Sequence, residues 1–443
     1  MDVPYIKVGI LHGKQIRFSL NGHYFDEQGN LYDHGEWLAV ATEDGIRFSY
    51  SDLFFDESTS VTLKPKHPNS NFVLSDVTIG IGFHWERKEK QTFQSCLQLL
   101  LKDGEIWAIN QLSIEDYLTS VISSEMSATS SVELLKAHAV ISRSWLLAQI
   151  EKNKNLHSKE SSYASEFRTE DELIKWYDRE DHKNFHVCAD DHCQRFQGIT
   201  RATTPYVDEA VKETWGQILS YDGKICDARF SKCCGGMTET FENAWESVPH
   251  AYLQQLVDAE QNPSGFKLDL TNETSARDWI LGKPDAFCNT NNKKVLSQVL
   301  NDYDQETNDF YRWEVTYTQE ELSELAHQRS GINFGLINDL IPMERGVSGR
   351  ITKLKIIGEK QTFTIGKELE IRKTLSKTHL YSSAFVVIKS EMDGKPIFTL
   401  KGAGWGHGVG LCQIGAAMMG DKGYSYKEIL NHYFRGAILE EKY

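Results

Sequence analysis

One glutamate stands out because of its place in a helical pattern. Apolar residues recur there at spacings of three and four, as on the buried face of an amphipathic helix: Ile114, Leu118, Val121 and Ile122. Glu125 lies almost three full turns after Ile114, so its carboxyl projects from the same face near the end of the helix. Desolvation and the negative end of the helix dipole would both raise the pKa of this carboxyl, which suits a general acid.

A purely structural explanation of Glu125 stays open. The carboxyl could cap the last turn of its helix, or pair with Lys136 or Arg143 in the following helix. That second helix carries Glu133, Lys136 and Arg143 along one side, so a polar stripe could face Glu125. A solvated face has the same spacing, and the pattern alone does not choose.

A second chemically suggestive group is a dense run of imidazoles and thiols. Twelve positions contain His182, His186, Cys188, His192 and Cys193. Zinc takes four such ligands, and a zinc ion would hold in place a polar segment with little apolar periodicity. A Cys188–Cys193 disulfide and plain surface histidines are the alternatives. Four protein ligands leave no open position for water, so we expect this metal to serve structure and no cofactor to serve catalysis.

The third group is a glycine-rich segment near the C-terminus, in which glycines surround Trp405 and His407 and Gln413 follows. Backbone can approach a ligand closely there, a tryptophan ring can stack on a sugar, and the polar side chains can donate hydrogen bonds. A phosphate-binding loop is excluded, because no Lys-Ser/Thr pair follows the glycines and the GxGxxG order is absent. A plain tight turn explains the glycines but not the other residues. We expect Trp405 and His407 to lie beside Glu125.

The elements that position these groups can be read from periodicity and turn signals. Short β-type runs separated by turn residues predict a β-rich N-terminal lobe over residues 1–110. The clearest runs are Ile6–Ile10, Trp37–Ala41, Ser60–Leu63 and Val73–Phe83. Ser113 with Asp116, and Ser130 with Glu133, have the spacing of a capping box. They predict helices over about 114–126 and 131–151, which form a hairpin.

We expect residues 111–443 to form one catalytic region. It contains an irregular, zinc-bearing excursion at 155–200, a mixed α/β segment at 270–395, and a glycine-rich loop with two short helices at 402–436. Within it we expect helices at 294–304 and 319–330, a capped helix after Ser425, and these strands: 217–221, 225–231, 350–358, 362–365 and 384–389. The predicted fold class is α+β, with the glycine-rich terminus closing a groove that contains Glu125.

Composition limits the classes of function. The 443 residues are 40% hydrophobic and 25% charged, as in an ordinary globular protein. A net charge of −15 argues against a nucleic-acid partner, because phosphate binding needs a basic face. No run approaches the roughly 18 apolar residues of a transmembrane helix, and no signal peptide is visible at the start. Eight cysteines are too sparse for a disulfide scaffold.

Several separated motifs, in the same order, resemble the stage II sporulation protein D (SpoIID)/LytB family. They are Glu115–Leu118, Ser124–Met126, Glu133–Arg143, Gly404–Ala416, and the intermediate block Ala228–Glu239 with Trp245 and Arg350. The resemblance covers about residues 112–436. Two departures stand out: Cys412 replaces the usual serine, and Cys233-Cys234 replace small hydroxyl residues.

The resemblance implies that the protein acts on peptidoglycan in the cell envelope. Family members are lytic transglycosylases on glycan strands, which leave 1,6-anhydro ends, or enhancers of an N-acetylmuramoyl-L-alanine amidase. Glu125 matches the catalytic glutamate. The expected substrate contacts are Lys136, Arg143, Trp405, His407 and Gln413. The family's zinc site resembles His182, Cys188, His192 and Cys193, with His186 competing for one place.

Overall fold

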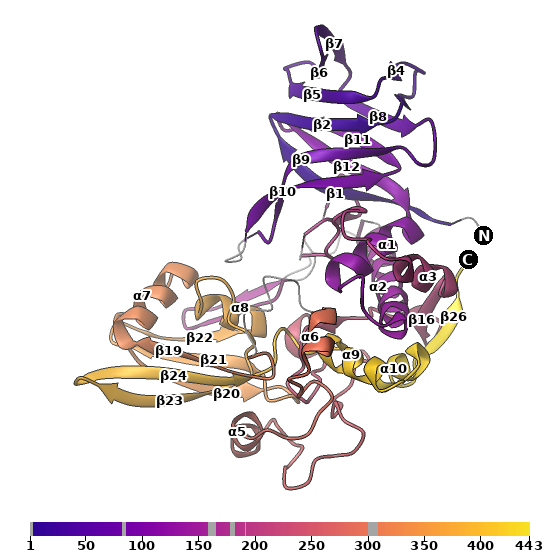
Figure 1. The fold of residues 1–443 in the computed structure, drawn as a ribbon. Helices are drawn as coiled ribbons and strands as arrows, with labels where there is room; N and C mark the ends of the chain where they lie inside the picture. Colours follow the sequence, from indigo (N-terminus) through magenta and orange to yellow (C-terminus); the bar gives the residue numbers. More distant parts are fainter. Residues whose placement is uncertain (1–2, 82–85, 158–164, 178–181, 191, 300–308) are drawn as a thin grey trace. The chain divides into compact units, whose positions relative to one another are not determined.

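The computed structural model describes residues 3–81, 86–157, 165–177, 182–190, 192–299 and 309–443 (Figure 1). The chain forms two compact units, and each is built from separated stretches of sequence. The first unit comprises Met1–Arg143, Asp181–Ile218 and Glu441–Tyr443. The second comprises Ser144–Glu180 and Leu219–Glu440. The expected lobe boundary after residue 110 falls inside the first unit, within strand β12.

Two antiparallel-rich sheets make up most of the first unit. In order across the first sheet the strands are β15 (Val187–Cys188), β1 (Tyr5–Gly13), β12 (Glu105–Ser113), β11 (Cys96–Lys102), β8 (Ser60–Pro65), β3 (Tyr24–Phe25) and β4 (Leu31–Tyr32). Across the second they are β10 (Arg87–Gln94), β9 (Asn71–Ile79), β2 (Gln15–Asn21), β5 (Gly35–Ala41), β6 (Ile46–Tyr50) and β7 (Leu53–Glu57).

Alternation of apolar and polar residues explains these sheets. In β2 the side chains of Ile16, Phe18 and Leu20 are buried, while the residues between them face outward. Phe18 then packs against an aromatic cluster that includes Trp37 and Phe48. The two sheets contact each other where β1 and β12 meet β2, so a shared apolar core lies between them.

Three helices complete the described part of the first unit: α1 (Ile114–Glu125), the beginning of α2 (Val132–His157), and α3 (Pro205–Glu213). The hydroxyl of Ser113 accepts a hydrogen bond from the Asp116 N–H, so the expected N-cap of α1 is confirmed. At the start of α2 the Leu134 N–H bonds to the hydroxyl of Ser131, one residue after the serine that we expected.

Beside two small sheets, two larger sheets form the core of the second unit. One has the order β13 (Glu166–Arg168), β14 (Glu172–Lys175), β22 (Thr362–Gly366), β21 (Ile351–Gly358) and β20 (Ile337–Arg345). The other has the order β19 (Arg312–Thr318), β24 (Lys395–Ala403) and β23 (Phe385–Met392). Helices α7 (Gln319–Ser330) and α8 (Glu368–Thr374) pack on them around Leu322, Ile356 and Ile371.

The remaining elements are short. They are β16 (Gln217–Tyr221), β17 (Lys224–Ile225), β18 (Phe230–Ser231), α4 (Phe241–Ala244), α5 (Glu273–Leu281), α6 (Lys293–Val299), β25 (Leu411–Cys412), α9 (Gln413–Asp421), α10 (Tyr426–Tyr433) and β26 (Ile438–Glu441). The two small sheets have the orders β17-β16-β26 and β18-β25. The capping box of Ser425 and Glu428 at the start of α10 is present, as expected.

The α+β class with a β-rich N-terminal region is confirmed: strands make up 37% of the chain and helices 24%. The expectation of a wholly irregular stretch over 155–200 is wrong for 166–175. These residues form the hairpin β13–β14, because Leu173 packs in the core and β14 pairs with β22. Residues 158–164, 178–181 and 191 of that stretch lie outside the described residues, as do 82–83 of one expected strand and 300–304 of one expected helix.

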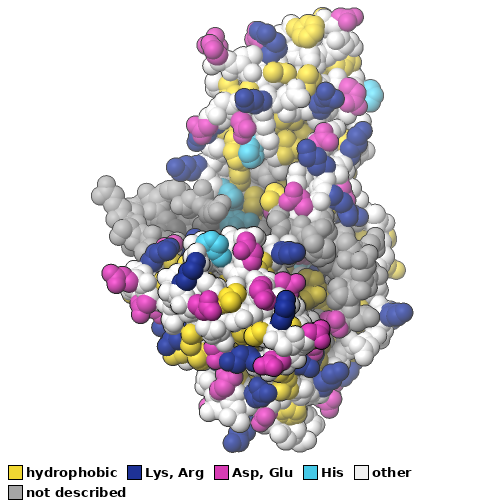
Figure 2. All heavy atoms as spheres, turned by 90° about the vertical axis from the view of Figure 1, so that its left-hand side faces the viewer, with side chains coloured by type: hydrophobic (Ala, Val, Ile, Leu, Met, Phe, Trp, Pro, Cys, Tyr) yellow, Lys and Arg dark blue, Asp and Glu magenta, His cyan; other side chains and the backbone are white. Residues whose placement is uncertain are grey.

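In the described part of the chain, no helix is long and apolar enough to cross a membrane. Basic and acidic side chains are interspersed over the described surface that faces the viewer in Figure 2.

Candidate functional site

Glu125 is the last residue of α1, and its side chain is only 9% exposed. The apolar stripe that leads to it is fully buried, as the spacing indicated. One carboxylate oxygen, Oε1, accepts a hydrogen bond of 2.9 Å from the backbone N–H of Arg195. The carboxyl group is therefore held in one orientation by the backbone of a segment seventy residues further along the chain.

That segment, residues 194–197, is fastened along α1 at two more points. The hydroxyl of Tyr117 donates to Oε1 of Gln194 over 3.1 Å, and the N–H of Gln197 donates to Oγ of Ser120 over 3.1 Å. Between them, the Phe196 ring stacks on Tyr117. Sequence reasoning missed this segment, because nothing in its residue types signals that its backbone supports a carboxyl group.

Arg143 and Lys136, expected to contact substrate, both form ion pairs in the first unit. The Arg143 side chain has no exposed surface and binds both carboxylate oxygens of Glu115, with distances of 2.8 and 2.6 Å. Its remaining nitrogen donates to the carbonyl of Gln217. Lys136 bridges Glu133 and Glu213 at 3.0 and 2.6 Å. These contacts argue against a direct role of Arg143 in substrate binding.

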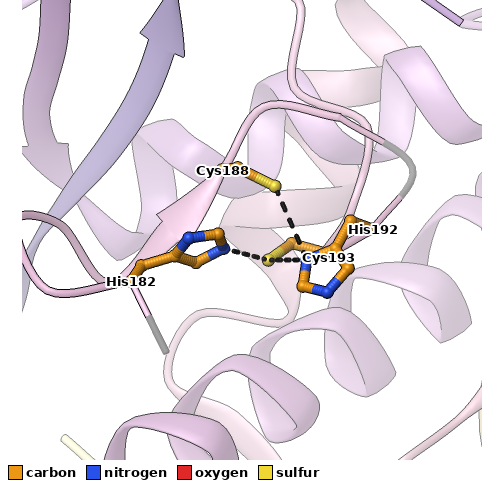
Figure 3. Close-up of side chains that lie close together, drawn as sticks. All are labelled: His182, Cys188, His192 and Cys193. Carbon is orange, nitrogen blue, oxygen red and sulfur yellow. Dashed lines mark hydrogen bonds between the residues drawn. The ribbon is translucent and has the colours of Figure 1, made fainter. Parts of the chain in front are cut away.

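The four expected zinc ligands converge on one point (Figure 3). The ligand atoms of His182, Cys188, His192 and Cys193 all lie within 4.8 Å of one another. Cys193 Sγ is 3.4 Å from Nε2 of His182 and 3.7 Å from Nδ1 of His192. Cys188 Sγ is 3.9 Å from the same Nδ1. The neighbouring Cys193 thiol lowers the pKa of Cys188, against the effect of burial.

These spacings fit a tetrahedral zinc ion. Bonds of about 2.3 Å to sulfur and 2.0–2.1 Å to nitrogen place the two atoms about 3.5 Å apart. His186 takes a different role, because its Nδ1 accepts the backbone N–H of Lys7 at 3.0 Å. The geometry therefore favours His182 over His186 as the fourth ligand. Cys193 directly precedes the segment 194–197 that holds Glu125.

In the second unit, the glycine-rich segment is a loop with a regular backbone alternation. Gly404, Gly406, Gly408 and Gly410 all have positive φ, from 73° to 92°. L-residues rarely adopt this conformation, so glycine is required at every second position. At Gly408 the need is double, because a Cβ atom would overlap the guanidinium group of Arg350.

The two functional candidates within this loop have different neighbours. The Trp405 ring stacks on Phe310 with centroids 4.8 Å apart. The His407 ring lies 4.7 Å from Trp245, and its Nδ1 accepts the N–H of Val409. Burial, followed by nearby arginines, lowers the pKa of His407 well below its usual value. The imidazole is thus a neutral group with an ordered ring.

Arg350 and Glu239, to which the sequence assigned no role, hold the glycine-rich loop through hydrogen bonds. Arg350 is 1% exposed and donates to the carbonyls of Gly406 and Cys234 and to Oγ of Ser348. Glu239 in turn accepts the hydroxyl and the N–H of Ser348. Their place in family-like motifs was visible, but their purpose was not. Gln413, the other predicted contact, is buried at the first position of α9.

Glu125, Lys136 and Arg143 therefore belong to the first unit, with the histidine and cysteine cluster, whereas Trp405, His407 and Gln413 belong to the second. We expected Trp405 and His407 to lie beside Glu125. Because these residues belong to different units, this expectation stays a prediction.

Comparison with known proteins gives two family matches. Residues 102–221 match the family described as Stage II sporulation protein (SpoIID). Residues 239–410 match one described as Domain of unknown function (DUF8618). The first match contains Glu125 and the four clustered ligands. The second contains Trp405 and His407.

Individual relatives agree. An uncharacterized protein of Brachyspira hyodysenteriae is 27% identical over 332 residues, or 75% of this chain and 67% of that protein. The amidase enhancer of Bacillus subtilis is 24% identical over 52% of this chain, but the match covers only 32% of the enhancer. Stage II sporulation protein D of Bacillus amyloliquefaciens is 22% identical over 75% of this chain and 76% of its own length. Residues 102–221 are therefore similar to the SpoIID family, and relatives named stage II sporulation protein D and amidase enhancer match a larger part of the chain.

Proposed function

We propose that this protein is a lytic transglycosylase that cleaves the glycan strands of peptidoglycan, with Glu125 as its proton-transferring residue. The observation that carries the proposal is the buried Glu125 carboxyl at the end of α1, oriented by the Arg195 N–H. Hydrolytic glycosidases generally use two carboxylates to activate water or form an intermediate. A transglycosylase uses a hydroxyl of its substrate as nucleophile, so one carboxyl group is sufficient.

The proposed reaction needs one group that gives and then takes a proton. Glu125 protonates the glycosidic oxygen as its bond to C1 of the muramic acid breaks. The C6 hydroxyl of the same sugar forms the new bond to C1, and its proton passes to Glu125. The product is a 1,6-anhydro end, and the carboxyl group returns to its starting state without consuming water.

A structural zinc ion at His182, Cys188, His192 and Cys193 completes the proposal. The near-tetrahedral spacing of these ligand atoms supports it. With four protein ligands the ion has no open position, so its part is to fix the chain. The fixed segment leads directly into the residues that orient Glu125.

The partners follow from the substrate. We propose glycan strands as the main partner and the bacterial cell envelope as the location. Trp405 and His407 are proposed sugar contacts. Lys136 and Gln413 are proposed to position their surroundings, since both are largely buried. Arg143 is proposed as a structural residue, contrary to our expectation from sequence.

A second candidate is an enhancer that binds the wall and stimulates an amidase without cutting glycan. The relative named amidase enhancer favours it. Glu125 would then have a structural task, as a carboxyl group that anchors the segment 194–197 to α1.

Digestion of purified glycan strands that lack stem peptides distinguishes the two functions. The wild-type protein should release products with 1,6-anhydro ends, detected by mass spectrometry. Glu125→Gln keeps the shape of the side chain and an acceptor for the Arg195 N–H but removes proton transfer. We expect its turnover to fall by at least about a hundredfold, with glycan binding retained.

Glu133→Gln provides a matched control, because it removes a partly exposed carboxyl from the neighbouring helix. Undiminished turnover by the Glu125→Gln variant would refute the role of this residue. If the wild type forms no anhydro ends but accelerates an added N-acetylmuramoyl-L-alanine amidase, the enhancer is the right function.

A further inference from the structure

Five chemically reactive side chains meet in the interior of the second unit, whereas the histidine and cysteine cluster belongs to the first. They are Cys233, Cys234, Asp258, Cys288 and Cys412, and none is more than 3% exposed. The two adjacent cysteines follow β18, Cys412 ends β25, and the other two residues come from loops. Three of the cysteines are the ones that depart from the family pattern, at residues 233, 234 and 412.

Four of the five offer ligand atoms at the spacing of a single metal ion. The ligand atoms of Cys234, Asp258, Cys288 and Cys412 all lie within 4.8 Å of one another. Sγ of Cys234 is 3.6 Å from Sγ of Cys288 and 3.4 Å from Oδ2 of Asp258. Two thiolates on a tetrahedral zinc ion, with bonds of about 2.3 Å, are about 3.8 Å apart. A disulfide would need about 2.05 Å.

The surroundings orient these ligands as a metal site requires. The backbone N–H of Cys234 donates to Sγ of Cys412 at 3.2 Å. Asp258 is held from two sides, by the Cys288 N–H at Oδ2 and by the Tyr433 hydroxyl at Oδ1. Hydrogen bonds of this kind fix the direction of ligating groups.

A glycine in helix α9 leaves room for the carboxylate of Asp258. At Gly415, in the first turn of α9, a Cβ atom would lie 2.6 Å from Oδ2 of Asp258. Only glycine therefore lets α9 pass this close. A buried carboxylate beside three thiols is costly unless a cation or donors compensate it. The Cys288 N–H and the Tyr433 hydroxyl compensate part of this cost, His432 Nε2 lies 3.7 Å from Oδ1, and a metal ion would add a direct positive charge.

We propose that Cys234, Asp258, Cys288 and Cys412 bind one divalent cation of the zinc type, as a second metal site separate from the histidine and cysteine cluster. Thiolates select soft or borderline ions, and the compact spacing suits one ion rather than an iron–sulfur cluster. Cys233, the fifth residue, is buried but does not belong to this group of four ligand atoms.

The place of the site explains what the ion does. Cys412 lies at the exit of the glycine-rich loop. Cys233 exchanges two backbone hydrogen bonds with Trp405 near the entrance of that loop, at 3.1 and 2.8 Å. Cys234 directly follows Cys233, which pairs with the start of the loop, and Cys412 follows the end of the loop. An ion bound to Cys234 and Cys412 therefore links the two ends of the loop. The loop is held by the metal, although none of residues 404–410 is a ligand.

Metal analysis of the full-length protein tests this site. The double variant Cys188→Ser/Cys193→Ser removes the other cluster and should retain about one zinc per chain. Adding Cys288→Ser or Cys412→Ser should reduce the content to zero. Adding Cys226→Ser should leave it unchanged, because this buried thiol lies outside the cluster. Zinc that persists after either Cys288→Ser or Cys412→Ser overturns the proposal.

X-ray absorption gives an answer that does not depend on the folding of variants. Wild-type protein should contain about two zinc ions per chain, with more sulfur than nitrogen or oxygen ligands in the average, because the new site adds three sulfurs and one oxygen. A single ion with two sulfur and two nitrogen ligands overturns the proposal. So does a disulfide among residues 234, 288 and 412, detected by mass spectrometry, or an iron–sulfur absorption spectrum.

Discussion

The ion pair of Glu115 and Arg143 is buried, so each charge depends on the other. Removing one partner from such a pair leaves an uncompensated charge and costs about 3–5 kcal/mol. We therefore expect Arg143→Ala to lower the free energy of unfolding by an amount in this range, measured by urea denaturation. The double variant Glu115→Gln/Arg143→Met should lose less, because no charge is left buried and the introduced amide oxygen would still accept the Gly216 N–H. Equal losses in both variants would contradict the structural role.

A histidine in the second unit should make stability depend on pH. Burial, followed by the neighbouring Arg372 and Lys373, lowers the pKa of His379 to about 4. In the unfolded chain the pKa is about 6.5. Between these values the unfolded state binds a proton that the folded state does not, so stability is full above pH 6.5 and falls as the pH drops toward 4.

His379→Gln should reduce the slope of unfolding free energy against pH in this range. The reduction corresponds to at most one proton taken up on unfolding. Thermal unfolding measured at half-unit steps from pH 4 to 7 would show it. The exposed His327→Gln serves as the control and should follow the wild type. If the Gln variant gave a curve parallel to that of the wild type, His379 would titrate alike in the folded and unfolded states, which contradicts the prediction.

Single residues were predictable where chemistry is local. The burial of Glu125 followed from its place on an apolar stripe, and the density of ligand types gave four residues that do meet. The partner of Arg143 was not predictable. Glu115 lies one position from a hydrophobic residue on the first helix, and spacing does not tell which carboxylate a buried arginine will reach across a hairpin.

At the scale of elements, the segment 194–197 connects the histidine and cysteine cluster, our proposed zinc site, to α1. Cys188→Ser/Cys193→Ser should release zinc and loosen this segment, although neither thiol touches Glu125. We expect faster hydrogen exchange at the Arg195 amide, which donates to Glu125, together with lower transglycosylase turnover. Cys96→Ser is the matched control, since Cys96 is a thiol of the same unit outside the cluster. Unchanged exchange at Arg195 after loss of zinc would disconnect the metal from Glu125.

Helices were easier to predict than strands for a physical reason. The cap of α1 and the helix over 319–330 rest on contacts within one turn, so the local sequence is sufficient. Strand β10 has the sequence RKEKQTFQ, and its first half is charged and mostly exposed. The alternation of apolar and polar residues that identifies a strand is therefore missing there. Strand β14 pairs in parallel with β22, almost two hundred residues later, and no local pattern indicates that partner.

At the scale of the whole molecule, the first unit is completed by Glu441–Tyr443. The Tyr443 hydroxyl donates to Oε1 of Glu115, and the Lys442 N–H donates to the carbonyl of Gly216. Tyr443→Phe should lower the free energy of unfolding of the first unit by about 1.5–3 kcal/mol, as for a hydrogen bond to a charged group. The exposed Tyr5→Phe is the control. If both variants unfold alike in urea, the hydroxyl contributes nothing.

The same three residues set an order of events on the ribosome. Roughly 220 residues separate Ile218 from Glu441. At about 5–20 residues per second, translation needs about 10–45 s to cross this gap. During that interval the residues of its two sheets and of α1 have been synthesised, while Tyr443, whose hydroxyl binds Glu115, has not. The unit that emerges first is therefore the last to be finished, and its nascent form is where chaperones and proteases have the longest access.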